Sequence, residues 1–152
     1  MSKEQAEKVI TAFPAFIKPQ DQTGGPGLET KMETPAIWTQ LEHWDQDGKP
    51  YLKEYEGRGL LKDKAVIITG GDSGIGRSAA ILMAREGADV TIAYLEEEKE
   101  DADYTIKQIE KAGRKGHGIA GDLKDEATCK KIVDEHMKVH GRLDCLVNNG
   151  MF

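Results

Sequence analysis

From residue 60 onward, short apolar runs alternate with longer amphipathic stretches, and turn residues separate the two kinds of segment. The apolar runs predict four strands, at residues 65–69, 90–94, 116–120 and 143–147. The amphipathic stretches predict three helices, at residues 75–86, 97–112 and 126–140. Strands that alternate with helices pair in parallel through right-handed crossovers. The pattern therefore predicts an α/β fold with a three-layer parallel sheet.

Apolar residues at helical spacing indicate which side of each predicted helix is buried. In the first helix they are Ile75, Ala79, Leu82 and Met83. In the second helix, the residues expected to face the sheet are Ala102, Ile106 and Ile109. In the third they are Cys129, Ile132, Val133 and His136, after Asp125 as the N-cap. A glycine after each stretch ends the helix, at positions 87, 113 and 141.

The first 59 residues follow a different pattern. They hold all five prolines and several isolated aromatic residues, without a sustained period of 2 or 3.6. One short helix is predicted at residues 3–12, before Pro14. We therefore expect two regions: residues 1–59 as an extended, mostly irregular N-terminal arm, and residues 60–152 as an incomplete α/β domain. The aromatic residues favour docking of the arm onto a folded surface, and a flexible extension is the alternative.

Composition excludes several classes of function. The formal net charge is −6 and the basic residues are scattered, so we expect no nucleic-acid partner. No apolar stretch approaches the roughly 20 residues that cross a bilayer, and the N-terminus leads into no signal peptide. We therefore expect a cytoplasmic protein without a membrane partner. Cys129 and Cys145 fit no zinc or redox spacing, which favours two reduced and partly buried thiols.

A glycine-rich turn follows the first predicted strand and opens the first predicted helix. Here a side chain at Gly70, Gly74 or Gly76 would crowd the turn, an approaching pyrophosphate, or the contact between helix and strand. Backbone N–H groups at a helix start bind phosphate. A nucleoside triphosphatase loop is disfavoured, because Arg77 stands where lysine is required and the fourth strand runs into Asn148 rather than an acidic magnesium ligand.

The spacing of Thr69-Gly70 and Gly74-Ile75-Gly76 resembles the cofactor loop of the short-chain dehydrogenase/reductase family, a Rossmann-type fold. Asp122-Leu123 matches the pair that contacts adenine in that family. Residues 146–150 resemble the Asn-Asn-Ala-Gly pattern after its fourth strand, although Gly-Met replaces Ala-Gly, and Gly-Arg-Leu-Asp at 141–144 is the usual lead into that strand. Two features resemble the glucose/ribitol dehydrogenase-like branch of this family. They are Pro19–Gln22 with Pro26-Gly27 in the arm, and the Gly-Gly-Asp-Ser loop at residues 70–73.

The resemblance implies a dinucleotide cofactor, NAD or NADP, and hydride transfer between its nicotinamide and an alcohol or carbonyl substrate. It also implies a homo-oligomer for the full-length protein, commonly a tetramer, with the arm packed along it. The phosphates would lie over the loop, the adenine near Asp122 and Leu123, and the ribose near Tyr94 and Asn149. The implied cofactor-binding residues are Gly70, Asp72, Ser73, Gly74, Ile75, Gly76, Tyr94, Asp122, Leu123 and Asn149.

The choice between NAD and NADP depends on the residue that ends the second strand, where an acidic side chain binds the ribose hydroxyl and a basic one binds a 2′-phosphate. Tyr94 stands there and follows neither rule. Asp72 and the glutamates at 96–98 would repel a 2′-phosphate, whereas Arg77 could attract one. NAD is therefore slightly favoured. The glutamates are also typical of a solvated helix start.

No catalytic residue is identified in the sequence. The family's catalytic serine and Tyr-x-x-x-Lys pair come later than Phe152, and none of the four tyrosines has a lysine four residues on. The alternative is therefore a catalytically inactive, truncated fragment that acts at most as a dinucleotide-binding or interaction module; an incomplete gene model is equally compatible. An apolar sheet edge and an uncovered face are expected. His136 and His140 lie one helical turn apart without a third ligand, so we expect surface histidines and no metal site.

Overall fold

A computed structural model describes residues 10–14 and 36–150 of the chain. The chain divides into two compact units, Met1–Tyr55 and Glu56–Phe152, each of which is described by itself. The helix predicted at residues 3–12 lies mostly outside the described residues. No helix in the described part of the chain is both long and apolar enough to cross a bilayer.

The first unit contains an antiparallel hairpin that the hydrophobic pattern did not predict. Strands β1 (Gln40–Trp44) and β2 (Pro50–Glu54) pair through a turn at Gly48, whose φ is +74°. Along β1 the polar Glu42 is partly buried, whereas Leu41 is 49% exposed. The Glu42 carboxylate accepts hydrogen bonds from Thr11 and the Ala12 N–H, which explains why a polar side chain faces inward. Polarity therefore does not alternate in the sense that indicates a half-buried strand.

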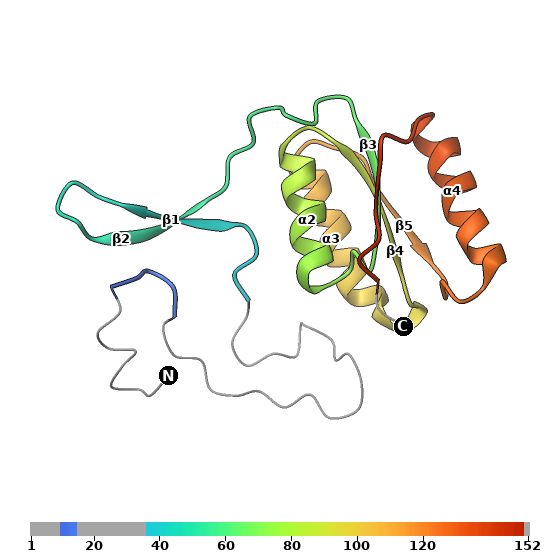
Figure 1. The fold of residues 1–152 in the computed structure, drawn as a ribbon, viewed down its shortest axis with the longest axis horizontal. Helices are drawn as coiled ribbons and strands as arrows, with labels where there is room; N and C mark the ends of the chain where they lie inside the picture. The colour runs from blue at the N-terminus through green and yellow to red at the C-terminus, as the bar shows by residue number, and fades with distance from the viewer. Residues whose placement is uncertain (1–9, 15–35, 151–152) are drawn as a thin grey trace. The chain divides into compact units, whose positions relative to one another are not determined.

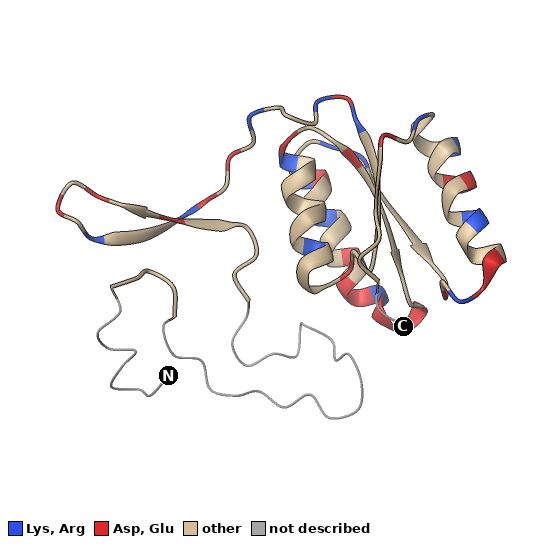
Figure 2. Cartoon of the chain, in the orientation of Figure 1, with Lys and Arg blue, Asp and Glu red and all other residues tan. Residues whose placement is uncertain are grey.

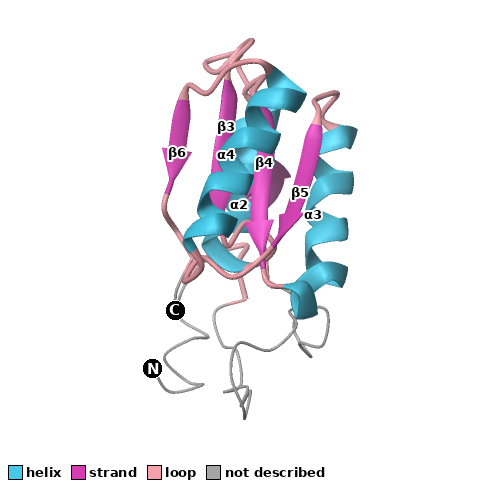
Figure 3. Cartoon of the chain, turned by 90° about the vertical axis from the view of Figure 1, so that its right-hand side faces the viewer, coloured by secondary structure: helices cyan, strands magenta, loops and turns pink. Residues whose placement is uncertain are grey.

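The second unit confirms the predicted three-layer α/β fold. Its elements in chain order are β3 (Ala65–Thr69), α2 (Gly74–Arg85), β4 (Asp89–Tyr94), η2 (Glu96–Glu98), α3 (Lys99–Lys111), β5 (Gly116–Ala120), α4 (Glu126–His140) and β6 (Cys145–Val147). The four strands pair in parallel in the order β5-β4-β3-β6. Helices α2 and α3 cover one face of the sheet and α4 covers the other (Figures 1 and 3).

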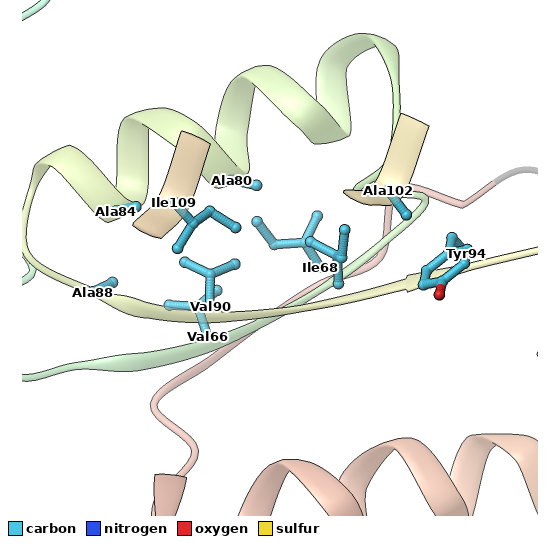
Figure 4. Packing of buried hydrophobic residues seen from close by; sticks show 10 residues of the cluster. Val66, Ile68, Ala80, Ala84, Ala88, Val90, Tyr94, Ala102 and Ile109 are labelled. Atoms are coloured by element: carbon cyan, nitrogen blue, oxygen red, sulfur yellow. The ribbon is translucent and has the colours of Figure 1, made fainter. Parts of the chain in front are cut away.

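Alternate residues of the central strands supply two separate cores. The larger core lies between the sheet and helices α2 and α3, and Figure 4 shows its ten buried residues: Val66, Ile68, Ala80, Ala84, Ala88, Val90, Ile92, Tyr94, Ala102 and Ile109. The smaller core, on the α4 side, consists of Ile67, Ala93, Ile119 and Ile132. Because neighbouring residues of a strand point to opposite faces, β3 and β4 contribute to both cores.

The buried face of α2 differs from the predicted one. Ile75 is 81% exposed, whereas Ala80, Ile81 and Ala84 are buried. Ala79 and Met83 pack only at the margin of the larger core. The alanines allow the helix axis to approach the sheet closely, so the buried stripe includes small residues that the prediction left out. In α3, by contrast, Ala102 and Ile109 are buried and Ile106 packs beside them, as predicted.

Helix α4 begins and ends as predicted but buries fewer residues. The Asp125 carboxylate accepts from the Ala127 N–H, and Gly141 ends the helix in the left-handed conformation. Ile132 and His136 are buried, whereas Val133 is 40% exposed. Both cysteines are exposed too, so the prediction of partly buried thiols is wrong.

Candidate functional site

The predicted site residues all follow the carboxyl ends of strands in the parallel sheet. The loop after β3 holds Gly70–Gly76, Tyr94 ends β4, Asp122 and Leu123 follow β5, and Asn149 follows β6. The strands are parallel and adjacent, so these segments come to one edge of the sheet. This edge is where open α/β sheets bind their ligands.

The turn between β3 and α2 is built so closely that two of its glycines cannot be replaced without displacing backbone. A Cβ atom on Gly76 would lie 1.9 Å from the Gly70 carbonyl oxygen. Gly70 has a φ of +61°, and a Cβ there would lie 3.0 Å from the Cα of Gly150. Gly74 also has a positive φ, +55°, but has open space around it. The steric prediction therefore holds most strongly for Gly76, at the contact between helix and turn.

Gly71 contributes to the same turn, although it is not among the predicted site residues. A Cβ on Gly71 would lie 2.4 Å from the Cγ2 of Ile92 in β4. The loop therefore packs directly against Ile92 of the larger core. Its place between Gly70 and Asp72 in a glycine-rich run was the only sequence signal that could have identified it.

The N-terminus of α2 offers an unmasked positive dipole end. Ser73 is the N-cap in extended conformation, its side chain makes no capping hydrogen bond, and the first turn holds no acidic residue. A helix start without a side-chain cap or a carboxylate favours binding of an anion from outside the helix. The residues therefore fit a pyrophosphate. Its negative charge would interact with the positive end of the helix dipole, where this helix has neither a side-chain cap nor a carboxylate in its first turn.

Asn149 joins the end of β6 to the glycine turn. Its Nδ2 donates to the carbonyl oxygens of Thr69, at 3.1 Å, and Gly70, at 3.0 Å. The Thr69 hydroxyl accepts from the N–H groups of Asn149 and Gly150, at 3.0 and 2.9 Å. The side chain thus braces the turn from the neighbouring strand. Thr69 is a second residue that holds the turn, although it is not among the predicted site residues.

Asp122 and Leu123 lie at the same edge with different degrees of burial. Asp122 is exposed, and its Oδ1 accepts from the Lys124 N–H at 2.9 Å. Leu123 packs against the smaller core. Leu123 also borders the segment after β6, because a Cβ atom added at Gly150 would lie 3.3 Å from the Cδ1 of Leu123. An exposed carboxylate beside an apolar side chain suits a flat heterocycle with polar edges.

Tyr94 lies mostly inside the larger core rather than on the surface (Figure 4). Its side chain is 9% exposed, and burial raises the pKa of the phenol above its ordinary value. Its carbonyl oxygen accepts from the Gly121 N–H at 2.9 Å, which connects the ends of β4 and β5. What Tyr94 presents at the edge is therefore chiefly its backbone and the end of its ring.

Arg77 is buried, so it does not attract a 2′-phosphate as the sequence suggested it could. The side chain is nearly inaccessible, and its Nη2 forms an ion pair of 2.7 Å with the Asp101 carboxylate. This geometry also argues against the triphosphatase reading, in which a basic side chain at this position extends onto phosphates.

Acidic residues gather at the same end of the sheet, where η2 leads into α3 (Figure 2). Asp72 is 2% exposed, and burial raises the pKa of its carboxyl group. The pKa of Glu98 is raised by burial first and then by the negative charge of Asp72. These shifts are those of carboxyl groups held together with little solvent.

The paired histidines of α4 both contact Thr91, and His136 is not a surface residue. His136 is fully buried; its Nδ1 lies 2.8 Å from the Thr91 hydroxyl and its Nε2 lies 2.9 Å from the Arg142 carbonyl oxygen. His140 Nε2 lies 3.2 Å from the same hydroxyl. Within the described ranges, no three His, Cys, Asp or Glu side chains could hold a metal ion together.

The parallel sheet, its crossover helices and the glycine turn define an α/β protein of the Rossmann type. The sequence model of the short chain dehydrogenase family matches residues 64–151, more than half of the chain. The chain belongs to this family, which confirms the resemblance found in its motifs.

Individual relatives agree with this assignment. The chain is 45% identical over 132 residues to the uncharacterized oxidoreductase YhdF of Bacillus subtilis, covering 87% of this chain and 41% of that protein. It is 36% identical to a glucose and ribitol dehydrogenase homolog of Oryza sativa, covering 86% and 42%. Apo glucose dehydrogenase of Caenorhabditis elegans superposes with a TM-score of 0.55 at 37% identity, covering 61% and 40%. The chain thus spans about two fifths of the length of these relatives.

Proposed function

We propose that this chain binds the dinucleotide cofactor of a short-chain oxidoreductase, with the pyrophosphate over Gly70–Gly76 at the start of α2. The observation that carries the proposal is the tight turn at Gly76: a Cβ atom added there would lie 1.9 Å from the Gly70 carbonyl oxygen. Such a turn has no need to exist for packing alone, because a wider turn would connect β3 to α2 equally well. Combined with an uncapped helix start, it brings backbone N–H groups close to a phosphate.

The other site residues would hold the adenosine half of the cofactor. Asp122 and Leu123 would contact the adenine, and the ribose would lie near the ends of β4 and β6, at Tyr94 and Asn149. Asn149 supports this arrangement indirectly, since its two bonds to carbonyl oxygens hold the turn against the sheet. When bound, the nicotinamide supplies or accepts a hydride. The proposed reaction of the whole protein is hydride transfer between this ring and an alcohol or carbonyl substrate.

We further propose that the cofactor is NAD rather than NADP. Arg77 is paired with Asp101, so the nearest buried cation is already neutralised. The charge of Asp72 helps to raise the pKa of Glu98, after burial, so the two carboxyl groups lie near each other, and added phosphate charge beside them would be repelled. Asp72→Asn is therefore expected to lower the ratio of the NADPH and NADH dissociation constants.

Titration calorimetry with NADH and NADPH tests both proposals. We expect saturable binding of one NADH per chain, at least about five-fold tighter than binding of NADPH, since the repulsion amounts to about 1 kcal/mol or more. Gly76→Asp should abolish binding. Gly113→Ala is the matched control, because Gly113 also has a positive φ, +76°, but ends α3 away from the loop. Equal NADH affinity in Gly76→Asp would contradict the proposed site.

A second candidate function is a dinucleotide-binding module that does not turn the cofactor over. The observation behind it is that none of the four tyrosines, Tyr51, Tyr55, Tyr94 and Tyr104, has lysine four residues on. A tyrosine base needs a nearby ammonium to lower its pKa from about 10. Oxidation of NADH by the chain with a panel of aldehydes and ketones would reject this candidate, while binding without turnover would support it.

We propose, again from the family, that the full-length protein is a homo-oligomer, most simply a tetramer. Sedimentation equilibrium of the full-length protein would give its mass. A monomer at micromolar concentration would contradict the proposal.

A further inference from the structure

We propose that Arg77 is a positioning residue for the glycine loop: with Thr105 of α3 it holds the Asp72 carbonyl, and so fixes the direction of the N–H groups that follow. The part of the proposal that concerns cofactor affinity rests on the proposed function above. The part that concerns the loop itself rests only on the contacts within the chain.

The Asp72 carbonyl oxygen accepts two hydrogen bonds from buried side chains. Arg77 Nε donates to it at 2.7 Å, and the Thr105 hydroxyl donates at 3.0 Å, with the Asp101 carbonyl oxygen as its more distant alternative acceptor at 3.2 Å. One donor comes from α2 and the other from α3, so the loop is joined to both helices that cover this face of the sheet. A backbone carbonyl in an irregular loop rarely needs two buried side-chain donors merely to satisfy it.

The orientation of this carbonyl determines where the next N–H group points. In a trans peptide the C=O of Asp72 and the N–H of Ser73 lie in one plane and point in opposite directions within it. Drawing the oxygen inward toward Arg77 therefore directs the Ser73 N–H to the other side of the loop. Ser73 is the N-cap of α2, where N–H groups bind anions.

Arg77 is itself held in a fixed position. Its Nη2 donates to the Asp101 carboxylate at 2.7 Å, its Nε lies 3.1 Å from the Thr105 hydroxyl, and the Tyr104 ring lies 5.0 Å from its guanidinium carbon. Both members of the ion pair are almost fully buried. A planar guanidinium can make these bonds at once in a rigid fork, whereas a lysine ammonium on a flexible stem cannot reproduce the geometry.

The same contacts predict a loop that is set in place before any ligand arrives. A preorganised loop loses less conformational freedom on binding, and so binds its ligand more tightly. A purely structural ion pair would stabilise α2 against α3 without altering the loop. The two roles are therefore separable: the structural role affects melting alone, and the positioning role also affects the loop amides and the affinity.

Thr105→Val provides the test, because valine has the shape of threonine but lacks the hydroxyl. We expect hydrogen exchange of amides 72–76 to accelerate about five-fold, since a hydrogen bond contributes about 1 kcal/mol. The NADH dissociation constant should rise by a similar factor. Thr105→Ser keeps the hydroxyl and should restore both values. Thr128→Val is the matched control, because the Thr128 hydroxyl bonds to Asp125 at the start of α4.

Arg77→Lys gives an independent second variant, for which we expect faster loop exchange and weaker NADH binding than in Thr105→Val. Loop exchange and NADH affinity at wild-type values in both variants, with lowered melting temperatures, would overturn the proposal. Accelerated loop exchange in a chain whose wild type binds no NADH would support the positioning role and reject the proposed function, so the two can fail separately.

Discussion

The two faces of the sheet are built differently. On the side of α2 and α3, ten buried residues form a continuous core, and a buried ion pair between Arg77 and Asp101 connects the two helices. On the side of α4 the buried core has four residues, and Val133 and Met137 on the helix are exposed. The glycine loop joins the face with the larger core. Buried contacts on the side of α2 and α3 therefore hold the loop in place.

The α4 face differs from the other face in that its buried polar contacts involve histidines. Thr91 of β4 is fully buried and lies within hydrogen-bond distance of both His136 and His140. On the opposite face the neighbouring Val90 and Ile92 belong to the larger apolar core. The contacts of His136 and His140 depend on the protonation of their rings, so the two faces should respond differently to mutation and to pH.

The largest effect on stability is expected in the glycine loop, on the side of α2 and α3. Gly76→Ala should cost about 4 kcal/mol of unfolding free energy, because the new Cβ would lie 1.9 Å from a backbone oxygen that cannot move alone. Gly113→Ala should cost only about 1–2 kcal/mol, the strain of a left-handed alanine. Urea unfolding of the two variants measures the difference. Equal costs would mean that the turn is looser than the structure shows.

Truncation of one isoleucine on each face compares the two cores directly. Ile109→Ala should cost about 3–4 kcal/mol and Ile132→Ala about 2 kcal/mol, since a residue beside exposed neighbours leaves a cavity that closes more easily. Both side chains are buried and equal in size, so each is a control for the other. A larger cost for Ile132→Ala in urea unfolding would reverse the comparison.

Acid should weaken the α4 face first. Burial lowers the pKa of His136, and also that of His140 on the same helix, so below about pH 6.5 the unfolded chain takes up protons that the folded chain resists. The contribution of His136 to stability is present above that pH and is lost as the pH falls through the folded pKa. The melting temperature should drop between pH 8 and pH 5, and His136→Gln should reduce the drop.

His43→Gln, on the hairpin of the other unit, is the control and should leave that pH dependence intact. The acid-induced loss should also appear in hydrogen exchange as opening of α4 before α2. Simultaneous opening of both helices would contradict the assignment of the effect to His136.

The smallest effect is expected on the outer side of α4. Val133→Lys should change the unfolding free energy by no more than about 0.5 kcal/mol, because the side chain is exposed. It should also reduce light scattering, because Val133 is an exposed apolar side chain. Ile132→Lys, one residue away and buried, should unfold the chain. A loss of more than 2 kcal/mol in Val133→Lys would mean that this surface is covered.

The succession of strands and helices along the chain was predictable because an apolar run, turn residues and an amphipathic helix occur in repeated order, and each rule is local. The hairpin was not predictable, since Glu42 faces inward to accept bonds from Thr11 and Ala12, a contact across 30 residues. The roles of Arg77 and His136 were missed for the same reason. Sequence spacing shows a charged or titratable residue on a helix, but only the packed structure shows that its partner lies on another element.

At the loop, the positions of Gly70 and Gly76 followed from spacing alone, because the steric rule concerns the turn itself. Gly71 did not, since its reason is the side chain of Ile92 on the next strand. The buried face of α2 was wrong at Ile75 because size, rather than closeness of approach, guided the prediction.

The most direct test of the account is calorimetric titration of the chain with ADP-ribose, which carries the pyrophosphate and adenosine but no nicotinamide. We expect saturable binding at one site, competition with NADH, and loss of both in Gly76→Asp but not in Gly113→Ala. Wild-type affinity for ADP-ribose in Gly76→Asp would contradict the claim that the turn between β3 and α2 holds the phosphates.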